Sequence, residues 1–246
     1  MSLCISKGWA GVENLTGIPG LVGAAPIQNI GAYGVEISDI IENVEVFDMS
    51  IGLPKVMDKT KCEFSYRNSI FKNQTKQELI VTKVTLKLFP NGKPRVILPE
   101  IKEELSKNSI SELSSIASVS LAVRNIRSRK LPDPEIQPNA GSFFKNPIVS
   151  KGKYKQLKKK YSITGWSVSG NIKLSAAWLI EKAGMQGFYI GSAKVSWKHA
   201  LVIVAEDGCR GEDILAIAIA VKKSVFDKFG ILLEPEVQII EGGKIL

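Results

Sequence analysis

The run Leu131-Pro132-Asp133-Pro134 interrupts the chain just past its middle and limits the folds that the sequence can adopt. Proline disfavours helix in the residue before it, so a helix that reaches this run must end there. The sequence before the run is dominated by strand-like patterns, and the sequence after it mixes helices and strands. We therefore predict an α+β fold with a domain boundary near these prolines.

Residues 9–40 are rich in glycine and poor in charge. Pro19 and Pro26 exclude a continuous helix here, because proline removes a helical hydrogen bond and clashes with the preceding turn. Residues 42–89 read as β structure: Val44 and Val46 alternate with polar neighbours, as strands with one buried face do. Asn91-Gly92 then predicts a turn.

Two helices are expected before the prolines, at 100–107 and 111–127, and two strands after them, at 188–190 and 200–205. The second helix carries a broad apolar face, formed by Leu113, Ile116, Leu121 and Ile126. Past the prolines we expect a lysine-rich helix and a helix over 173–183 with Gly184 as its C-cap. A long helix over 212–229 that stops at Gly230 and a last strand near 236–240 complete the prediction.

The composition excludes several classes of protein. The longest apolar stretches are too short to span a bilayer, and the N-terminus has no secretory signal pattern. Cys4, Cys62 and Cys209 are odd in number and widely spaced, so they fit neither a disulfide framework nor a zinc site. We expect a cytoplasmic protein that does not bind a membrane.

The net charge of +9 invites a nucleic-acid interpretation. The basic residues do not favour it, because the densest run, at 151–160, has the spacing of a solvated helix face. A diffuse positive field can still attract an anionic small substrate. We therefore expect no nucleic-acid partner.

The chain has one histidine, His199, so metal-ligand clusters and most histidine-based nucleophile schemes are excluded. Neither a G-x-x-x-x-G-K-[ST] loop nor a G-x-G-x-x-G fingerprint is present. Glycines recur instead as G-x-x-G, at Gly20/Gly23 and at Gly31/Gly34. Such a loop can present backbone amides to a phosphate or a flavin, or can simply pack tightly on a sheet.

Residues 139–147, Asn-Ala-Gly-Ser-Phe-Phe-Lys-Asn-Pro, form the most informative candidate site. Gly141 permits a close approach of the backbone to a ligand, and the two phenylalanines can exclude water around Ser142. Lys145 and Asn146 offer donors to an anionic or carbonyl partner. A structural turn in front of buried phenylalanines has the same pattern, so both interpretations stay open.

Three further runs carry charged groups. Arg67 lies among aromatic residues, where it either recognises a carboxylate or stacks on Tyr66 at the surface. Residues 124–130 can clamp a diphosphate or complement the dipole of a helix end. Glu236, next to Pro235, is an acid that needs a partner if it is buried.

The order of these runs along the chain resembles that in the UDP-N-acetylenolpyruvoylglucosamine reductase (MurB) family, in its type I form. The resemblance covers essentially the whole chain. The matching runs are Gly11–Leu15, Ile18–Gly34, Tyr66–Ser69, Lys130–Pro134, Asn139–Pro147, Lys173–Ile180 and Leu233–Val237.

The resemblance implies a flavoenzyme of peptidoglycan precursor synthesis. In this family NADPH reduces FAD, and hydride then passes to C3 of UDP-N-acetylglucosamine enolpyruvate, which becomes UDP-N-acetylmuramate. By the match, Ser142 is the proton donor to the resulting enolate. Arg67 and Glu236 act at the substrate carboxylate, with Glu236 either protonated or paired with Arg67.

The same match implies binding residues. The expected FAD-binding residues are Gly20, Gly23, Pro26, Ile27, Gln28, Ile30 and Gly31. The residues expected at the UDP-sugar are Lys130, Arg127, Asn146 and His199.

The resemblance also implies a domain organisation: 1–127 as the remainder of an FAD-binding domain of the PCMH/VAO type, 128–231 as the substrate-binding domain, and 232–246 packing back on the first domain. The family carries a further N-terminal lobe with a Gly-Gly-Gly-Ser-Asn-like loop, which this sequence lacks. Leu98-Pro99-Glu100 stands where the family's mobile loop usually carries Tyr-Gly.

Two functions follow from these departures. The chain is either a reductase completed by a separately encoded N-terminal lobe or a catalytically impaired fragment that retains only UDP-sugar binding.

Overall fold

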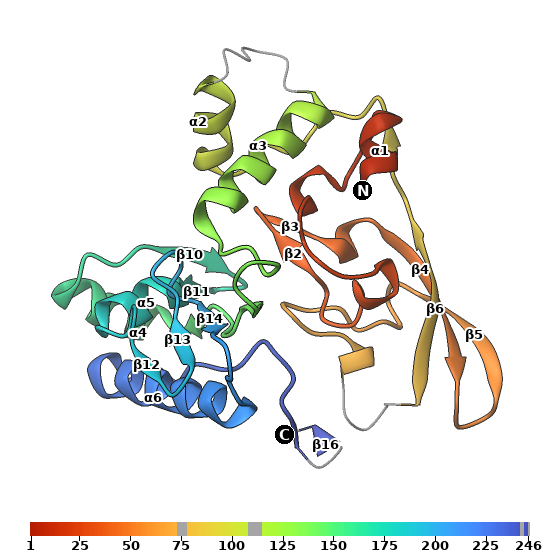
Figure 1. Ribbon diagram of the computed structural model, residues 1–246. Helices are drawn as coiled ribbons and strands as arrows, with labels where there is room; N and C mark the ends of the chain where they lie inside the picture. The colour runs from red at the N-terminus through yellow and green to blue at the C-terminus, as the bar shows by residue number, and fades with distance from the viewer. Residues whose placement is uncertain (73–77, 108–114, 242–243, 246) are drawn as a thin grey trace. The chain divides into compact units, whose positions relative to one another are not determined.

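The computed structural model describes residues 1–72, 78–107, 115–241 and 244–245 (Figure 1). The chain forms two compact units, Met1–Arg129 and Lys130–Leu246, and each is described by itself. No helix in the described ranges is long and apolar enough to cross a membrane.

The first forty residues form short elements rather than one helix, as the prolines and glycines predict. These elements are α1 (Ser2–Ser6), β1 (Trp9–Ala10), η1 (Glu13–Leu15), η2 (Val22–Ala24), β2 (Gly31–Ala32), β3 (Val35–Glu36) and η3 (Ile37–Asp39). β2 and β3 form a hairpin whose two turn residues, Tyr33 and Gly34, have φ of 51° and 81°. Positive φ at both positions matches the twist of the flanking strands.

A three-stranded antiparallel sheet in the order β5-β4-β6 is the largest sheet of the first unit. Its strands are β4 (Ile41–Asp48), β5 (Leu53–Asp58) and β6 (Leu79–Leu86), which confirms strands within 42–89. Val44, Val46 and Met57 are buried, whereas Val56 and Ile80 are exposed. The sheet therefore buries one face, as the alternation predicts. The unit also contains η4 (Ile70–Lys72) and β7 (Phe89–Pro90), which pairs with β1.

Two helices end the first unit: α2 (Pro99–Lys107) and α3 (Ile116–Lys130). Ile116 and Ile126 are buried, as expected, but Leu121 is exposed, so its place on the apolar face was wrong. Residues 111–114, and with them Leu113, lie outside the described residues. The buried face is completed instead by Val119 and Val123.

In its described residues, the second unit contains three sheets and three helices. A four-stranded sheet in the order β12-β13-β14-β8 consists of β8 (Asn139–Ser142), β12 (Tyr189–Ile190), β13 (Ala193–Val195) and β14 (Val202–Ala205). A three-stranded sheet in the order β10-β11-β9 consists of β9 (Ile148–Val149), β10 (Gly165–Val168) and β11 (Asn171–Leu174). The helices are α4 (Lys151–Lys160), α5 (Ala176–Lys182) and α6 (Gly211–Phe229), and β15 (Ile240–Glu241) pairs with β16 (Lys244–Ile245).

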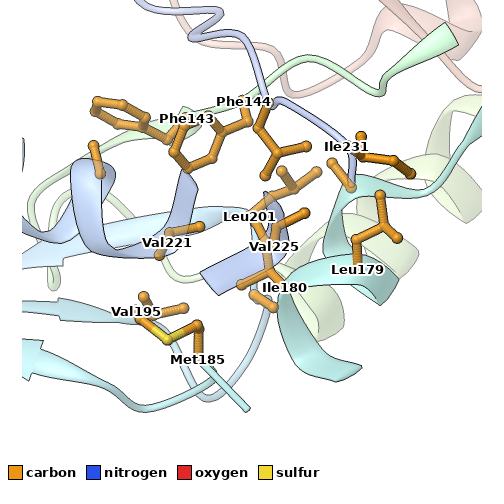
Figure 2. Packing of buried hydrophobic residues seen from close by; sticks show 14 of the residues in the cluster. Phe143, Phe144, Leu179, Ile180, Met185, Val195, Leu201, Val221, Val225 and Ile231 are labelled. Atoms are coloured by element: carbon orange, nitrogen blue, oxygen red, sulfur yellow. The ribbon is translucent and has the colours of Figure 1, made fainter. Parts of the chain in front are cut away.

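Side chains from strands, helices and loops fill a single core in this unit (Figure 2). Phe144, Leu179 and Ile180 are almost fully buried, and Phe143 and Phe144 meet edge to face with ring centroids 5.0 Å apart. Such a pair contributes beyond its buried area. The two phenylalanines that follow Ser142 are therefore core residues as well as neighbours of the candidate acid.

Two expectations for the second half are corrected. Residues 173 and 174 belong to β11, not to a helix, and the helix begins only after Ser175, whose side chain caps it by accepting from the amide of Trp178. Residues 236–239 are irregular, and the strand starts at Ile240. The predicted end of α6 is confirmed, because Gly230 has φ of 60° and the left-handed conformation of a C-cap.

Candidate functional site

Ser142 lies at the end of β8, directly after a β-bulge. Ser142 pairs with Val202 and Asn139 with Val204, so two residues of β8 oppose one residue of β14. Gly141 has φ of 72°, which glycine adopts without strain, and its amide donates to Oδ1 of Asn139 at 2.9 Å. A β-bulge changes the direction of the neighbouring side chains. The left-handed conformation of Gly141 therefore determines where the side chain of Ser142 points.

Glu236 is held beside this segment through the main chain. The amide of Glu236 donates to the carbonyl oxygen of Phe143 at 2.8 Å. The amide of Lys145 donates to the carbonyl oxygen of Glu234 at 2.9 Å. Phe144 and Pro235 form an isolated antiparallel bridge between these bonds. The second unit therefore brings the predicted acids Ser142 and Glu236 into one neighbourhood.

The hydroxyl of Ser142 is half-buried and, within the ranges that the structure describes, forms no hydrogen bond with another protein group. The next two residues, Phe143 and Phe144, are buried. A hydroxyl that lies beside buried aromatic side chains and has no protein partner can donate a hydrogen bond to a bound ligand. The geometry therefore supports the ligand-binding interpretation of 139–147 together with a structural role for its phenylalanines.

Asn146 has a structural task that sequence patterns did not reveal. Its Oδ1 accepts a hydrogen bond from the amide of Ala176 at 2.9 Å, at the first turn of α5. Helix N-termini leave amides without partners, and a side-chain oxygen satisfies one of them. The amide nitrogen of Asn146 has no hydrogen-bond partner in the described ranges and remains available for the predicted role at the substrate.

His199 lies in the loop between β13 and β14, close to the end of β8. Its Nδ1 accepts from the amide of Leu201 at 3.3 Å, and the carbonyl of Leu201 accepts from the amide of Phe143. Burial lowers the pKa of His199 below its ordinary 6.5, and the charge of Lys130 lowers it further. The second unit thus places two further predicted substrate residues, His199 and Lys130, near each other.

Arg67 belongs to the first unit and sits at a tight turn. Ser65 and Asn68 exchange two main-chain hydrogen bonds of 3.1 Å, and Arg67 has φ of 54°. Its guanidinium donates through Nη2 to the carbonyl of Gly31 at 2.5 Å and stacks on the ring of Tyr66, 5.1 Å from its centroid. Arg67 is therefore fixed inside the unit, with 16% of its side chain exposed.

Two residues near Arg67 were missed as functional candidates. Glu36 approaches the guanidinium, with Oε1 4.0 Å from Nη1, and Asn29 donates through Nδ2 to Oε2 of Glu36 at 2.8 Å. Both residues lie in the Ile18–Gly34 run or directly after it. An asparagine and a glutamate close to Gly31 and Gly34 were the sequence signal for them.

The loop of the predicted FAD-binding residues has the features of an anion cradle. Gly20 has φ of 113°, and no atom lies within 4 Å of a Cβ placed on it. In the described part of the chain, no carbonyl accepts from the amides of residues 20–23, while Leu21 and Val22 are exposed. Gly31 serves close packing instead, because a Cβ there would lie 2.9 Å from Nη1 of Arg67.

Pro26, Ile27, Gln28 and Ile30 follow the loop as the chain folds toward β2. Pro26 is buried and the other three are half-buried, and the carbonyl of Ile27 accepts from the hydroxyl of Ser69 at 2.6 Å. Ile27 and Ile30 pack against the hydrophobic core of the first unit. The loop and the residues after it fit a phosphate or a flavin, the class of ligand predicted for the loop.

Arg127 lies on α3 in the first unit, beside Tyr33. Burial lowers the pKa of its guanidinium, and the nearby Tyr33 opposes that shift. Burial, followed by the charge of Glu100, raises the pKa of Tyr33 to about 12. A half-buried guanidinium can bind a phosphate through two parallel hydrogen bonds, and Arg127 stays a prediction for that role.

Across the described ranges, no group of three or more His, Cys, Asp or Glu side chains is arranged to hold a metal ion. Arg67, Arg127 and the glycine loop belong to the first unit, and Ser142, Glu236, Lys130, Asn146 and His199 to the second. Each candidate group is thus defined within its own unit.

Comparisons with known proteins identify the class. The family model of the C-terminal domain of UDP-N-acetylenolpyruvoylglucosamine reductase matches residues 133–240. A crystal structure of this reductase (MurB) from Thermus caldophilus matches with a TM-score of 0.65 and 27% identity, over 96% of this chain and 66% of that one. The fold and the matched domain place the chain among the α+β oxidoreductases.

Curated relatives identify the family more closely. The reductase from Amoebophilus asiaticus is 45% identical over 240 residues, which cover 97% of this chain and 70% of the relative. The reductase from Shewanella oneidensis is also 45% identical and covers 94% of this chain and 67% of the relative. The chain belongs to the UDP-N-acetylenolpyruvoylglucosamine reductase family, an oxidoreductase family of peptidoglycan precursor synthesis. It spans about two thirds of the length of these relatives.

Proposed function

We propose that this chain acts on UDP-N-acetylglucosamine enolpyruvate and supplies the proton-donating and carboxylate-binding groups for its reduction to UDP-N-acetylmuramate. One observation carries the proposal: the half-buried hydroxyl of Ser142 has no protein hydrogen-bond partner in the described ranges and lies beside Glu236. The expected cofactors are FAD and NADPH. When bound, FAD supplies the hydride, taken from NADPH, that adds to C3 of the enolpyruvyl group.

Ser142 then protonates C2 of the substrate. Addition at C3 leaves an enolate over C2 and the carboxylate, and such an enolate is basic enough to take a proton from an alcohol held against it. The new C–H bond forms as the O–H bond of Ser142 breaks. Phe143 and Phe144 support this role by excluding water that would compete for the enolate.

Arg67 and Glu236 act on the substrate carboxylate. Negative charge on that group grows as the enolate forms, and a guanidinium held in place stabilises it more in the transition state than in the ground state. The fixed contacts of Arg67 to Gly31 and Tyr66 support this role, because little reorganisation is needed at the moment of reaction. Glu236 acts in its protonated form or paired with a cation, since a bare carboxylate would repel the enolate.

The UDP moiety is assigned to Lys130, Arg127, Asn146 and His199. Lys130 and Arg127 offer positive charge to a diphosphate, and the amide nitrogen of Asn146 offers a donor. The lowered pKa of His199 supports a neutral ring near pH 7, which contributes a hydrogen bond rather than a charge.

FAD would be held by the exposed amides of the Gly20–Gly23 loop and by Pro26, Ile27, Gln28, Ile30 and Gly31. The loop fits such a ligand because its amides face no protein carbonyl in the described ranges. We further propose that the first unit is an FAD-binding subdomain of the PCMH/VAO type. The domain bounds 1–127, 128–231 and 232–246 stay predictions.

A cytoplasmic location also stays a prediction. It rests on the odd number and wide spacing of Cys4, Cys62 and Cys209.

The visible absorption spectrum of the purified chain tests the proposal. With FAD added, and with the N-terminal lobe of a relative supplied in trans, we expect flavin absorbance that is bleached by NADPH and restored by the enolpyruvyl substrate. No flavin binding under any of these conditions would contradict the reductase assignment.

The second candidate function is UDP-sugar binding without redox chemistry. It is favoured by the second unit, which has a hydrophobic core of its own and carries the matched C-terminal family domain. Calorimetric titration with UDP-N-acetylglucosamine separates the two functions: binding in a chain that never takes up flavin supports the binding-only function.

A further inference from the structure

Arg67 is surrounded by protein acceptors rather than by solvent. Nη2 donates to the carbonyl of Gly31 at 2.5 Å, and Nη1 reaches the carbonyl of Asn29 at 3.5 Å and Oε1 of Glu36 at 4.0 Å. The hydrogen bond to Gly31 alone would still allow the guanidinium to rotate about that bond. Asn29 and Glu36 therefore help to set the direction of the guanidinium, together with the stack on Tyr66.

Asn29 is fixed on every side. It is fully buried and adopts φ of 49°, a left-handed conformation that asparagine tolerates better than most residues. Its Nδ2 donates to Glu36 at 2.8 Å and to the carbonyl of Ser65 at 3.0 Å, and its Oδ1 accepts from the amide of Ser38 at 3.1 Å. The side chain thereby ties the β3 segment to the turn that carries Arg67.

Glu36 is fixed by two neighbours. Its Oε2 accepts from Asn29, and its side chain also accepts from the main-chain amide of Asp39 in a capping box at η3. The amide of Glu36 donates to Oδ2 of Asp39 at 3.3 Å. Glu36 is thus a negative charge of fixed position facing one edge of Arg67, although its side chain is 34% exposed.

We propose that Asn29 and Glu36 are positioning residues for Arg67. Asn29 holds Glu36 and presents its own carbonyl, and together they keep the guanidinium directed for a planar, two-point contact with a carboxylate. The inference rests on the proposed function, in which that carboxylate belongs to the enolpyruvyl group. Neither residue touches the substrate in this role.

Positioning has a characteristic kinetic effect. A guanidinium that must be reoriented during the reaction loses transition-state stabilisation more than ground-state binding. Asn29→Asp keeps the shape and the acceptor for Ser38 but removes both donated hydrogen bonds. Glu36→Gln keeps an acceptor for Asn29 but removes the charge facing Arg67.

The first experiment needs neither cofactor nor substrate. Nuclear magnetic resonance of ¹⁵N-arginine-labelled full-length chain resolves the guanidinium of Arg67, identified as the signal lost in Arg67→Lys. We expect slow rotation of this group in the wild type and exchange-broadened signals in Asn29→Asp and Glu36→Gln. Asn91→Asp is the matched control, because Asn91 is an exposed asparagine with a similar φ of 55°. An unchanged Arg67 signal in both variants would overturn the proposal.

The second experiment is a double-mutant cycle on turnover by the FAD-loaded chain, with a relative's N-terminal lobe if loading requires it. Each variant should lower kcat about 10- to 100-fold with little change in KM and in flavin reduction by NADPH. In an Arg67→Lys background the further loss should be within about 3-fold, because the residues act through Arg67. An equal loss in both backgrounds would refute positioning. Glu36 is partly exposed, so Glu36→Gln keeps the test open if Asn29→Asp fails to fold.

The two experiments separate the two claims. A wild-type chain that shows the slow Arg67 rotation, lost in the variants, but never turns over the substrate contradicts the proposed function and leaves the positioning of Arg67 established.

Discussion

The amide of Glu236 donates a hydrogen bond of 2.8 Å to the carbonyl oxygen of Phe143. This bond joins the C-terminal run that begins at Leu233 to the segment that carries the candidate acid Ser142. The Phe144–Pro235 bridge next to it makes the connection rigid. The candidate proton donor Ser142 and its candidate partner Glu236 are therefore held by main-chain contacts, so substitution of their side chains leaves these contacts in place.

Ser142→Ala should leave the reduction of flavin by NADPH intact and lower turnover of the enolpyruvyl substrate by roughly two to four orders of magnitude, because the enolate loses its proton source. Stopped-flow absorbance measures both half-reactions. Ser167→Ala, at an exposed serine of the same unit, is the control. Nearly unchanged turnover in Ser142→Ala would exclude Ser142 as the acid.

A pair of substitutions separates the two tasks of Asn146. Asn146→Asp keeps the oxygen that caps α5, so its stability should be close to that of the wild type, while substrate affinity falls. Asn146→Ala removes the cap and should cost about 1 kcal/mol of unfolding free energy in addition. Urea unfolding and calorimetric titration make the comparison. Equal stability of the two variants would contradict the capping role.

Gly141→Ala should destabilise the chain by about 1 kcal/mol or more, because alanine resists φ of 72°. The space around the position is open, so the cost comes from the backbone rather than from a clash. Gly208→Ala is a matched control for stability, since Gly208 combines φ of 77° with equally open space. If both variants lose stability equally but only Gly141→Ala loses turnover, the bulge is needed to aim Ser142.

His199 should make the chain less stable in mild acid. Its pKa is lowered by folding, so as the pH falls below 6.5 the unfolded chain binds a proton that the folded chain does not. The free energy of unfolding then decreases by up to about 1.4 kcal/mol for each unit by which the pH falls. Urea unfolding at pH 7.5, 6.5 and 5.5 measures the slope. His199→Gln should flatten it, and an identical slope would show that other groups are responsible.

The three thiols should react at different rates. Cys62 is fully buried and donates to the carbonyl of Asp58, and burial raises its pKa to about 11, with Asp58 adding to the shift. Cys4 and Cys209 are half-buried. A colorimetric thiol titration at pH 8 should modify these two first and Cys62 only on unfolding. Rapid reaction of all three would contradict the buried position of Cys62.

Elements with strong local signals could be predicted from sequence. Alternating valines identified β4, and glycine in the left-handed conformation ended α6 at Gly230. The helix expected over 173–183 failed at its start, because Leu174 is held in β11 between two partner strands. A four-residue strand that depends on pairing leaves no periodicity to detect.

The residues of the candidate site also fall into those that the sequence indicated and those that only the structure revealed. Ser142, Arg67 and Glu236 were candidates from their local sequence, and the resemblance then implied their roles. Asn29 and Glu36 were not, because their significance depends on contacts with Arg67, Ser65 and Ser38 that only the folded chain makes. The cap formed by Asn146 at α5 was missed for the same reason.

The bulge in β8 makes the length of the 139–142 segment matter as much as its residues. Side chains of a strand alternate between its two faces, so the extra residue exchanges the faces of everything that follows it. With one residue fewer, the strand would run regularly from the Asn139–Val204 pair to the Ser142–Val202 pair, and no residue would need the φ of 72° that Gly141 has. A single-residue deletion here would thus keep Ser142 opposite Val202 but remove the bend and added twist of the bulge, so the hydroxyl would point in another direction even though every residue assigned to the chemistry would still be encoded.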